Sequence, residues 1–557
     1  MKSKNIQADY IIVGAGSAGC VLANRLSEDP DVRVVLLEAG TSDYAWDWRI
    51  HMPAALAYPM NGTRYSWDYH TEPEPHLDGR SLHCPRGRVL GGSSSINGQV
   101  YIRGHALDYD RWAREDPGLK DWDYAHCLPY FQKAVDHPET SPTYHSTEGP
   151  LSVERGAGNN PLNQAFLAAA KEAGYPYTED MNGFQQEGFG PMDRTTQRGH
   201  RHSSAQAYLH PVNKRKNLTV LTQAQTLEIR FNGQRACGVT LKHRGRNKAI
   251  DAEREVLLCT GPINTPQLLM LSGIGPGDDL RVHNISVKSE LPGVGRNLQD
   301  HLEIYIQMAC KKPVSLYRYY NLFGKAWVGA RWLFTRQGIG CSNQFETGGF
   351  IHSRPGIEHP DLQYHFFPMA VRYDGRSPNK AHGFQAHVGP MRSKSRGQVK
   401  LRSADPHIPP SICFNYMSDE ADWQTSRAAI RLTREIFSQT AFQPYAGAEI
   451  APGSDKQSDA DLDSYLRQAV ESAYHPCGTA QMGTHNNAVV DENCRVYGVE
   501  GLRVVDSSIM PSIVSGNLNA PTIMIAEKAA DLIAGKPALP PNNAPVFYRS
   551  NWQEKQR

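Results

Sequence analysis

The 557-residue sequence predicts an α/β protein, α+β overall. A Rossmann-like dinucleotide-binding domain, assembled from discontinuous segments, is joined to a second domain built on an antiparallel sheet. Two observations lead to this prediction. A strand, a glycine-rich turn and the start of a helix follow one another near the N-terminus. Short apolar runs typical of buried strands recur far along the chain, whereas a long central stretch alternates apolar and polar residues.

The N-terminal motif is DYIIVGAGSAG, at residues 9–19. Gly14 permits a tight turn, Gly16 lets the backbone approach a pyrophosphate, and Gly19 lets the helix pack close to the strand. The phosphate charge would lie at the helix N-terminus. A second strand, VRVVLLE, ends in Glu38, where a carboxylate can accept hydrogen bonds from an adenosine ribose. This combination favours dinucleotide binding over an ordinary βαβ unit, and Glu38 disfavours NADP, whose 2′-phosphate it would repel.

Three further strand-like runs predict the rest of the nucleotide-binding sheet. They lie at residues 217–222, 255–261 and 502–508, and turn-forming residues bound each of them. Helical patterns follow two of these runs, at residues 265–272 and 520–533. The nucleotide-binding domain is therefore expected to come from three separated parts of the chain.

The stretch from about 311 to 455 has a different pattern. FQAHVGPM, GQVKLRSADP and PSICFNYM alternate, with Pro and Gly between them, as in an antiparallel sheet. We therefore predict nucleotide-binding segments at 1–155, 217–310 and 456–540, the last also catalytic. The remaining predicted parts are a cap segment of the substrate domain at 156–216, a substrate-binding domain at 311–455 and a polar surface tail at 541–557.

Composition excludes several classes of function. The 59 basic and 57 acidic side chains nearly cancel, so no nucleic-acid-binding surface is expected. No apolar run approaches the ~20 residues of a membrane-spanning helix, and no signal peptide is recognised. Ten cysteines without a C-x-x-C pair predict reduced thiols and no metal site. From composition we expect a soluble protein of the cytoplasmic side.

Two more glycine-containing turns follow the first. GRVLGGSSSING, at residues 87–98, offers backbone N–H groups and hydroxyls to a phosphate or to the polar edge of a flavin ring. Alone, such a run is more often a surface loop. GPINTPQLLMLSGIG, at residues 261–275, follows a strand and combines a proline-containing turn with an apolar helix.

Together the three motifs resemble the glucose–methanol–choline (GMC) family of FAD-dependent oxidoreductases. The N-terminal fingerprint and both internal signatures match position by position, and the resemblance extends from residue 9 to about 535. Choline-oxidising members are the most similar, in MPAALAYP, NGFQQEGFGPMDRT, ELPGVGRNLQDHLE, CFNYMSDEADWQ and HPCGTAQMG. The resemblance implies FAD as cofactor and oxidation of choline to betaine aldehyde. Oxidation of the hydrated aldehyde would continue to glycine betaine.

The expected FAD-binding residues lie in the three nucleotide-binding segments. They are Gly14, Gly16, Ser17, Ala18, Gly19, Glu38, Ala39, Arg88, Gly92, Ser93, Asn97, Gly98, Ala224, Gly261, Asp506, Ser507 and Thr522. Some choline-oxidising relatives carry a histidine in the first internal signature that links covalently to FAD. The matching residue here is Ile96, which cannot form that bond, so FAD is expected to bind non-covalently.

The family resemblance also assigns catalytic residues. Oxidation of an alcohol by a flavin needs a base for the hydroxyl proton while a hydride leaves the carbon. In GMC enzymes the histidine of a His-Pro motif, and a His or Asn some 40 residues later, take this position. His475 in YHPCGT is therefore the expected acid–base catalyst, and Asn519 in GNLNAPT the expected partner that orients the alkoxide. Without the motif, a structural role would be preferred for any one of 22 histidines.

Choline also requires a site for a quaternary ammonium group, which aromatic faces and a carboxylate can hold. The sequence resembles that of choline-oxidising relatives at residues 299–303, where Glu303 would be the anionic partner. His365 in LQYHFFP is similar to a second active-site histidine of those enzymes. For the four residues YHFF, core packing is expected at three. Glu346 is a weaker candidate for the carboxylate.

Other functions remain open at this stage. The chain could oxidise a different primary alcohol, or it could be a GMC lyase that keeps FAD only structurally. A non-catalytic binding protein is the least favoured, because it would have no use for His475 opposite a flavin. The resemblance further implies a quinone or respiratory-chain electron acceptor and peripheral contact with the cytoplasmic membrane face. The sequence does not fix the oligomeric state.

Overall fold

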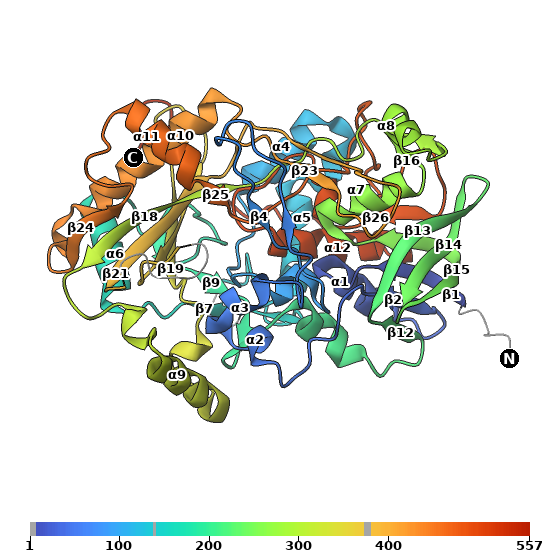
Figure 1. Cartoon of the computed structure of the whole chain (residues 1–557), viewed down its shortest axis with the longest axis horizontal. Coiled ribbons are helices and arrows are strands. Elements are labelled where there is room, and N and C mark those ends of the chain that lie inside the picture. The colour runs from blue at the N-terminus through green and yellow to red at the C-terminus, as the bar shows by residue number, and fades with distance from the viewer. Residues whose placement is uncertain (1–6, 138–140, 373–379) are drawn as a thin grey trace.

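The computed structural model describes residues 7–137, 141–372 and 380–557. It contains two sheets of seven strands each, which lie at opposite ends of the view in Figure 1. The predicted fold class is confirmed: one sheet is largely parallel and belongs to the nucleotide-binding part, and the other is antiparallel. Helices from distant parts of the chain cover both sheets.

The first sheet has the strand order β12-β2-β1-β15-β14-β13, and β26 also pairs with β15. Its parallel core joins β12, β2, β1, β15 and β26, which are short and apolar because both faces are covered. The strands are β1 (Gln7–Val13), β2 (Val34–Leu37), β12 (Leu218–Leu221), β13 (Ala224–Asn232), β14 (Arg235–His243), β15 (Arg246–Leu258) and β26 (Leu502–Val504). The sheet thus takes strands from all three predicted nucleotide-binding segments.

Two helices begin at the glycine turns that follow strands β1 and β15 of this sheet. Helix α1 (Ser17–Leu26) follows β1 and packs against α12 (Asn519–Ala534), which also contacts α5 (Tyr124–Ala134). Helix α7 (Gly261–Leu271) follows β15 directly. Gly535 ends α12 in the left-handed region at φ 65°, a conformation that glycine adopts without steric cost.

The second sheet has the order β24-β18-β21-β20-β19-β8, with β25 also paired to β18. All its pairs are antiparallel. Helices α10 (Glu420–Phe437) and α6 (Pro161–Glu172) pack against its strands over an aromatic core. The strands are β8 (Gly188–Pro191), β18 (Leu302–Cys310), β19 (Thr347–Ile351), β20 (Leu362–Phe367), β21 (Gly383–Pro390), β24 (Ala446–Ala451) and β25 (Glu471–Ser472).

The predicted boundaries differ from this sheet in two respects. Strand β18 was placed in the segment 217–310 but belongs to the antiparallel sheet, because its partners are β21 and β24. The alternating runs near residues 398 and 411 form a separate two-stranded unit, β22 (Gln398–Lys400) with β23 (Ser411–Cys413). Alternation indicates a half-buried strand but not the sheet that it joins.

The remaining segments lie around these sheets. The last residues run along the surface, where the backbone N–H of Phe547 donates to Phe184. All ten cysteines are unpaired. In the described parts of the chain, no helix is both long and apolar enough to cross a bilayer. Other helices are α2 (Trp48–His51), α3 (Ala57–Met60), α4 (Ala106–Glu115), α8 (Gly277–Val282), α9 (Leu322–Thr335) and α11 (Asp459–Ala469).

Candidate active site

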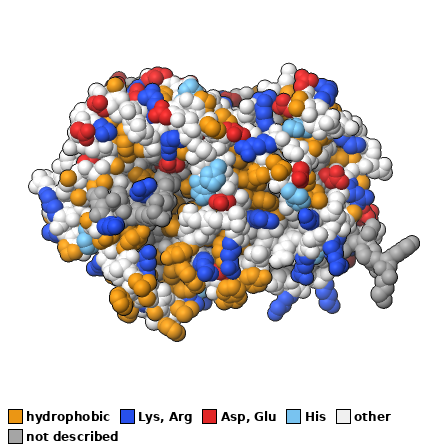
Figure 2. All heavy atoms as spheres, in the orientation of Figure 1, with side chains coloured by type: hydrophobic (Ala, Val, Ile, Leu, Met, Phe, Trp, Pro, Cys, Tyr) orange, Lys and Arg blue, Asp and Glu red, His pale blue; other side chains and the backbone are white. Residues whose placement is uncertain are grey.

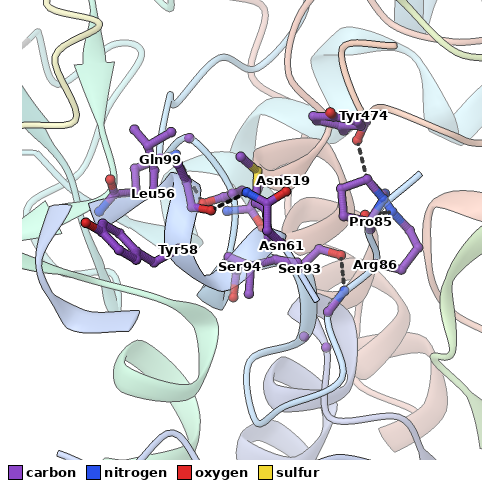
Figure 3. A pocket seen from close by; sticks show the side chains of 18 of the residues that line it. Leu56, Tyr58, Asn61, Pro85, Arg86, Ser93, Ser94, Gln99, Tyr474 and Asn519 are labelled. Carbon is purple, nitrogen blue, oxygen red and sulfur yellow. Dashed lines mark hydrogen bonds between the residues drawn. The ribbon is translucent and has the colours of Figure 1, made fainter. Parts of the chain in front are cut away.

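One large cavity connects the two sheets. Its volume is about 1490 Å³, and it extends from the carboxyl ends of β1 and β2 to strands β18, β20 and β21. Pockets for a single small ligand are usually ~300–1,000 Å³. The size therefore suits a dinucleotide together with a small substrate. Figure 3 shows part of its wall, where Arg86 donates to the carbonyl oxygen of Tyr474 at 2.8 Å and the Ser93 hydroxyl accepts from the backbone of Gly87 at 3.1 Å.

The glycine turns meet at one end of this cavity. Their backbones lie too close together for a side chain to fit between them. A Cβ on Gly19 would lie 1.9 Å from the carbonyl oxygen of Gly14, and one on Gly92 would lie 2.6 Å from Cα of Gly16. Gly14 also has φ +97°, in the region that favours glycine. Helix α1 begins at Ser17 with no side-chain cap at Gly16. Its first N–H groups are thus available to a pyrophosphate, as the sequence motif predicts.

Glu38 lies at the adjacent end of β2 and lines the same cavity. Its carboxylate accepts hydrogen bonds from the backbone N–H groups of Ala15 at 3.1 Å and Gly40 at 2.8 Å. Burial raises its pKa to about 7. The two bonds fix the carboxylate beside the glycine turn, where the ribose of a dinucleotide would lie.

The C-terminal segment joins the site through Asp506. Its carboxylate accepts from the N–H of Gly261 at 2.9 Å and from the Thr265 hydroxyl at 2.7 Å. Burial raises its pKa. This contact ties the chain after β26 to the start of α7, so residues separated by some 240 positions form one wall.

Most of the expected FAD-binding residues line this cavity. Gly19 and Arg88 do not: Gly19 packs beneath Gly14, and Arg88 lines a smaller cavity beside Ala39, with its guanidinium over the ring of Trp67. The residues present fit FAD, because the close-packed glycines leave a backbone cradle and a fixed carboxylate lies beside it. The cavity-lining members are Gly14, Gly16, Ser17, Ala18, Glu38, Ala39, Gly92, Ser93, Asn97, Gly98, Ala224, Gly261, Asp506, Ser507 and Thr522.

His475 lies on the cavity wall three residues after β25. Its backbone N–H donates to Asp300 Oδ1 at 2.7 Å, and the Tyr416 hydroxyl holds the other oxygen of that carboxylate at 2.6 Å. Burial raises the pKa of Asp300 to about 6. The loop that carries His475 is therefore anchored by a buried carboxylate.

A chain of contacts sets the tautomer of His475. The carbonyl oxygen of Met391, 3.0 Å from His301 Nε2, can only accept, so His301 carries its proton on Nε2. Since His301 is then unprotonated at Nδ1, His475 donates to it from its own Nδ1 at 3.1 Å. His475 Nε2 is left with a lone pair, which accepts from the amide of Asn517 at 3.0 Å. Burial lowers the pKa of His475 well below its usual range, and neighbouring histidines act in the same direction.

The partner of His475 differs from the prediction. The contact is made by Asn517, whereas the side chain of Asn519 accepts a hydrogen bond from the Ser17 hydroxyl at 2.7 Å. Helix α12 begins at Asn519 and packs on α1, so its first side chain is directed to the start of that helix. Asn517 lies in the preceding loop and extends to His475. Both asparagines line the cavity.

Glu303 and His365 come to the same cavity on the antiparallel sheet. Tyr305 pairs with His387, and His387 pairs with His365, so the three side chains form a row across β18, β21 and β20. Glu303 precedes Tyr305 by two positions and therefore shares its face. Glu303 Oε1 lies 3.3 Å from the Tyr305 hydroxyl and 3.5 Å from His387 Nδ1.

Successive side chains of β20 face alternately the core and the cavity. Tyr364 and Phe366 are fully buried in the aromatic core, whereas His365 and Phe367 line the cavity. Core packing thus holds for two of the four YHFF residues, not three. Burial lowers the pKa of His365 to about 4, and its Nε2 has no hydrogen-bond partner among the described residues. His365 is thus a neutral histidine on the cavity wall, and no described residue hydrogen-bonds its buried Nε2.

Two other carboxylates near the site are engaged elsewhere. Glu346 accepts from the Ser342 hydroxyl at 2.6 Å and from the N–H of Gly158 at 3.0 Å, and it does not line the cavity. Glu471, which sequence reasoning did not single out, pairs with Glu303 across β25 and β18 and forms an ion pair with Arg80. Burial raises the pKa of Glu471 to about 7. Glu303 is thus the carboxylate of the sequence prediction that faces the cavity.

Comparison with known proteins gives a consistent result. Models of the GMC oxidoreductase family match residues 8–303 and 393–526. The chain is 56% identical over 556 residues to an oxygen-dependent choline dehydrogenase of Chromohalobacter salexigens, and 100% of each chain is covered. A protein of the same name from Proteus mirabilis is 55% identical, with 97% of this chain and 98% of that protein covered.

Solved structures share the architecture. The crystal structure of pyridoxine 4-oxidase from Mesorbium loti superposes with a TM-score of 0.86 at 31% identity, covering 95% of this chain and 100% of that one. A formate oxidase of Aspergillus oryzae superposes with a TM-score of 0.89 at 26% identity, covering 96% and 99%. Likeness of both sequence and architecture thus extends over nearly the whole chain.

Proposed function

The chain belongs to the GMC oxidoreductase family, and on that premise we propose that it oxidises choline to betaine aldehyde with FAD as cofactor. The observation that carries the proposal is the placement of Glu303, with aromatic neighbours, in the cavity that also holds His475. A carboxylate and aromatic faces suit a quaternary ammonium. The nearby histidine suits the hydroxyl end of the same small molecule.

The residues that would hold FAD are those of the glycine turns and of the β2 end. Ser17 and the first turn of α1 would take the pyrophosphate, Glu38 the ribose, and the turn at Gly92 and Ser93 the flavin side. When bound, FAD supplies the acceptor for the hydride that leaves the alcohol. The side chains of the protein hold the substrate in position and take up its hydroxyl proton.

His475 is proposed to take the proton from the hydroxyl of the substrate. Its Nε2 is unprotonated, which is the form that a general base requires, and the substrate hydroxyl would replace the Asn517 amide at its lone pair. The amide N–H of Asn517, beside that nitrogen, can donate to the resulting alkoxide. Glu303, Tyr305 and His365 then hold the substrate at its cationic end, so that the carbinol carbon is kept between the two sheets.

Anaerobic reduction of the flavin tests the proposal against its alternatives. Choline should bleach the flavin absorbance of the holoenzyme, and uncharged primary alcohols should do so far more slowly. A lyase with structural FAD would show no bleaching with any of these alcohols. Equal rates with choline and an uncharged alcohol of the same size would assign the site to a different substrate.

Reoxidation in the same experiment tests the electron acceptor. We propose a quinone or another respiratory-chain carrier, with the protein peripheral at the cytoplasmic membrane face. The names of the relatives include "oxygen-dependent", so molecular oxygen is the alternative. The reduced enzyme should be reoxidised faster by a soluble quinone than by air-saturated buffer. Reoxidation by oxygen at an equal rate would make the protein an oxidase.

FAD attachment gives a separate prediction. Ile96 is buried against Ile50, Tyr65 and Val89 and lines the cavity where relatives carry the linking histidine. The hydrocarbon side chain of isoleucine offers no nucleophilic atom, so FAD is expected to be non-covalent. Acid precipitation should release the yellow cofactor into the supernatant. Flavin that stays on the precipitated chain would contradict this.

A further inference from the structure

Helix α9 is the most exposed apolar element in the described part of the chain. Leu322, Phe323 and Phe334 are exposed by 80%, 86% and 82%, and Trp327 and Leu333 are also exposed. We call these five residues the α9 patch. The helix protrudes from the body of the molecule in Figure 1, and hydrophobic side chains gather at the same place in Figure 2. Contiguous apolar surface of this kind marks a binding surface.

One buried side chain holds α9 to the protein. Trp332 packs against Met52 and Ala55, and its Nε1 donates to the carbonyl oxygen of Gly199 at 2.7 Å. No other residue of this fourteen-residue helix is buried. Most helices in proteins are stabilised by packing of an apolar face. Helix α9 contacts the short turns at residues 316–319 and 339–341, but the side chains of the α9 patch stay exposed, so burial of this apolar surface must come from a partner.

The charges around the patch identify the kind of partner. Residues 316–336, which are α9 with the turn that precedes and contacts it, contain no Asp or Glu and carry four cations: Arg318, Lys325, Arg331 and Arg336. Exposed tryptophan and tyrosine side chains lie on the segment that precedes and includes α2 and α3, at Tyr44, Trp46, Trp48 and Tyr58. Apolar and aromatic side chains with a cationic surround are typical of proteins that lie in the interface of an anionic bilayer.

A second copy of the chain fits this surface less well. A two-fold dimer presents the same patch on both subunits. It would therefore bring the cations of two α9 helices together, and juxtaposed like charges oppose association. An anionic lipid surface has the opposite charge. We propose that the α9 patch seats the protein on the surface of an anionic lipid bilayer.

The inner side of α9 extends this proposal to the active site. Lys325, Ala326, Gly329 and Ala330 line the cavity that contains His475, as do Leu322 and Leu333 at the edge of the patch, whereas Phe323, Trp327 and Phe334 do not. Helix α9 thus lies between the proposed bilayer surface and the cavity. A lipid-soluble electron acceptor would reach the cavity from the membrane at this helix. This step rests on the proposed function, which includes contact with a membrane face, whereas the assignment of that contact to α9 rests on the exposed patch alone.

Vesicle co-sedimentation of the holoenzyme tests the proposal. Vesicles of phosphatidylcholine with phosphatidylglycerol should bind the protein, and vesicles of phosphatidylcholine alone should bind it more weakly. The triple variant Phe323→Ser, Trp327→Ser, Phe334→Ser should bind at least about tenfold more weakly, because these side chains supply the buried apolar area. Arg331→Glu should weaken binding to the anionic vesicles alone, by about fivefold or more per charge, and added salt should reduce this difference.

Matched measurements separate the outcomes. Val282→Ser removes an exposed apolar side chain on α8 and should leave vesicle binding unchanged. All variants should retain choline oxidation with a soluble dye, since none of these residues lines the cavity. Vesicle binding equal to the native level in the triple variant would overturn the proposal. Loss of a dimer in the triple variant, without loss of vesicle binding, would assign the patch to a second copy. Bound protein that fails to oxidise choline would refute only the proposed function.

Discussion

Replacement of His475 by alanine is expected to leave FAD bound and to slow flavin reduction by choline by ~10²–10⁴-fold, the usual contribution of a positioned acid–base group. The variant keeps the glycine turns, Glu38 and Asp506, so cofactor content should equal that of the native protein. Anaerobic stopped-flow measurement of flavin bleaching gives the rate. A reductive rate close to the native one would remove His475 from the mechanism.

The structure explains why this histidine in particular should act as base. Asp300 fixes its backbone, and the relay from Met391 through His301 places the proton on Nδ1. Because burial lowers the pKa of His475, the imidazole is neutral at physiological pH. A neutral ring with its Nε2 lone pair directed to the cavity can accept a proton without first losing one. Only the Asn517 amide, which now donates to that lone pair, has to release it when the substrate hydroxyl binds.

The two asparagines supply a matched pair of controls. Asn517→Ala removes the amide beside His475 Nε2 and should slow flavin reduction, although less than loss of the base. Asn519→Ala removes the contact between α12 and Ser17 and should affect cofactor retention more than the reductive rate. Slow flavin reduction in the Asn519 variant with native behaviour in the Asn517 variant would reverse this assignment.

These asparagines also show how far sequence reasoning reaches. The glycine motif predicted the turn at Gly14 correctly, because only a residue without Cβ fits there and the spacing of the glycines is fixed by the turn itself. Asn517 and Asn519 are separated by one residue and both fit the expected spacing. Which of them faces His475 depends on where α12 begins, and helix boundaries are decided by packing against distant elements. No local pattern contains that information.

In the antiparallel sheet, too, local patterns predicted some features and missed those that depend on distant residues. Alternation correctly predicted a strand at FQAHVGPM, which is β21, but at YHFF core packing was expected for three residues and holds for two. It could not show that β18 leaves the segment of the nucleotide-binding domain, because strand pairing joins residues far apart in the chain. The row Tyr305, His387 and His365 depends on two registers, β18 with β21 and β21 with β20, and was therefore not predictable residue by residue. The position of Glu303 relative to that row needed the structure.

Replacement of Glu303 by glutamine should raise the KM for choline far more than it lowers the rate at saturation. A carboxylate in a cavity closed by flavin and aromatic side chains would attract a trimethylammonium group with little competition from water. Removal of one member of a desolvated charge pair costs ~2–5 kcal/mol, or about 30-fold to several thousand-fold in affinity. Aromatic contacts alone contribute ~0.5–2 kcal/mol. Steady-state kinetics with a soluble dye measures both parameters.

The neutral carbon analogue of choline, with a tert-butyl group in place of the ammonium head, separates charge from shape. It should be a poor substrate of the native enzyme and should lose little more in Glu303→Gln, because it has no charge for the carboxylate to attract. Glu346→Gln is the matched control, since that carboxylate lies outside the cavity and should leave the KM for choline unchanged. Equal damage to both substrates in Glu303→Gln would mean that Glu303 supports the strand rather than the cation. Its carboxylate contacts Tyr305 and His387 of that same sheet, so the comparison between the two substrates is what distinguishes the roles.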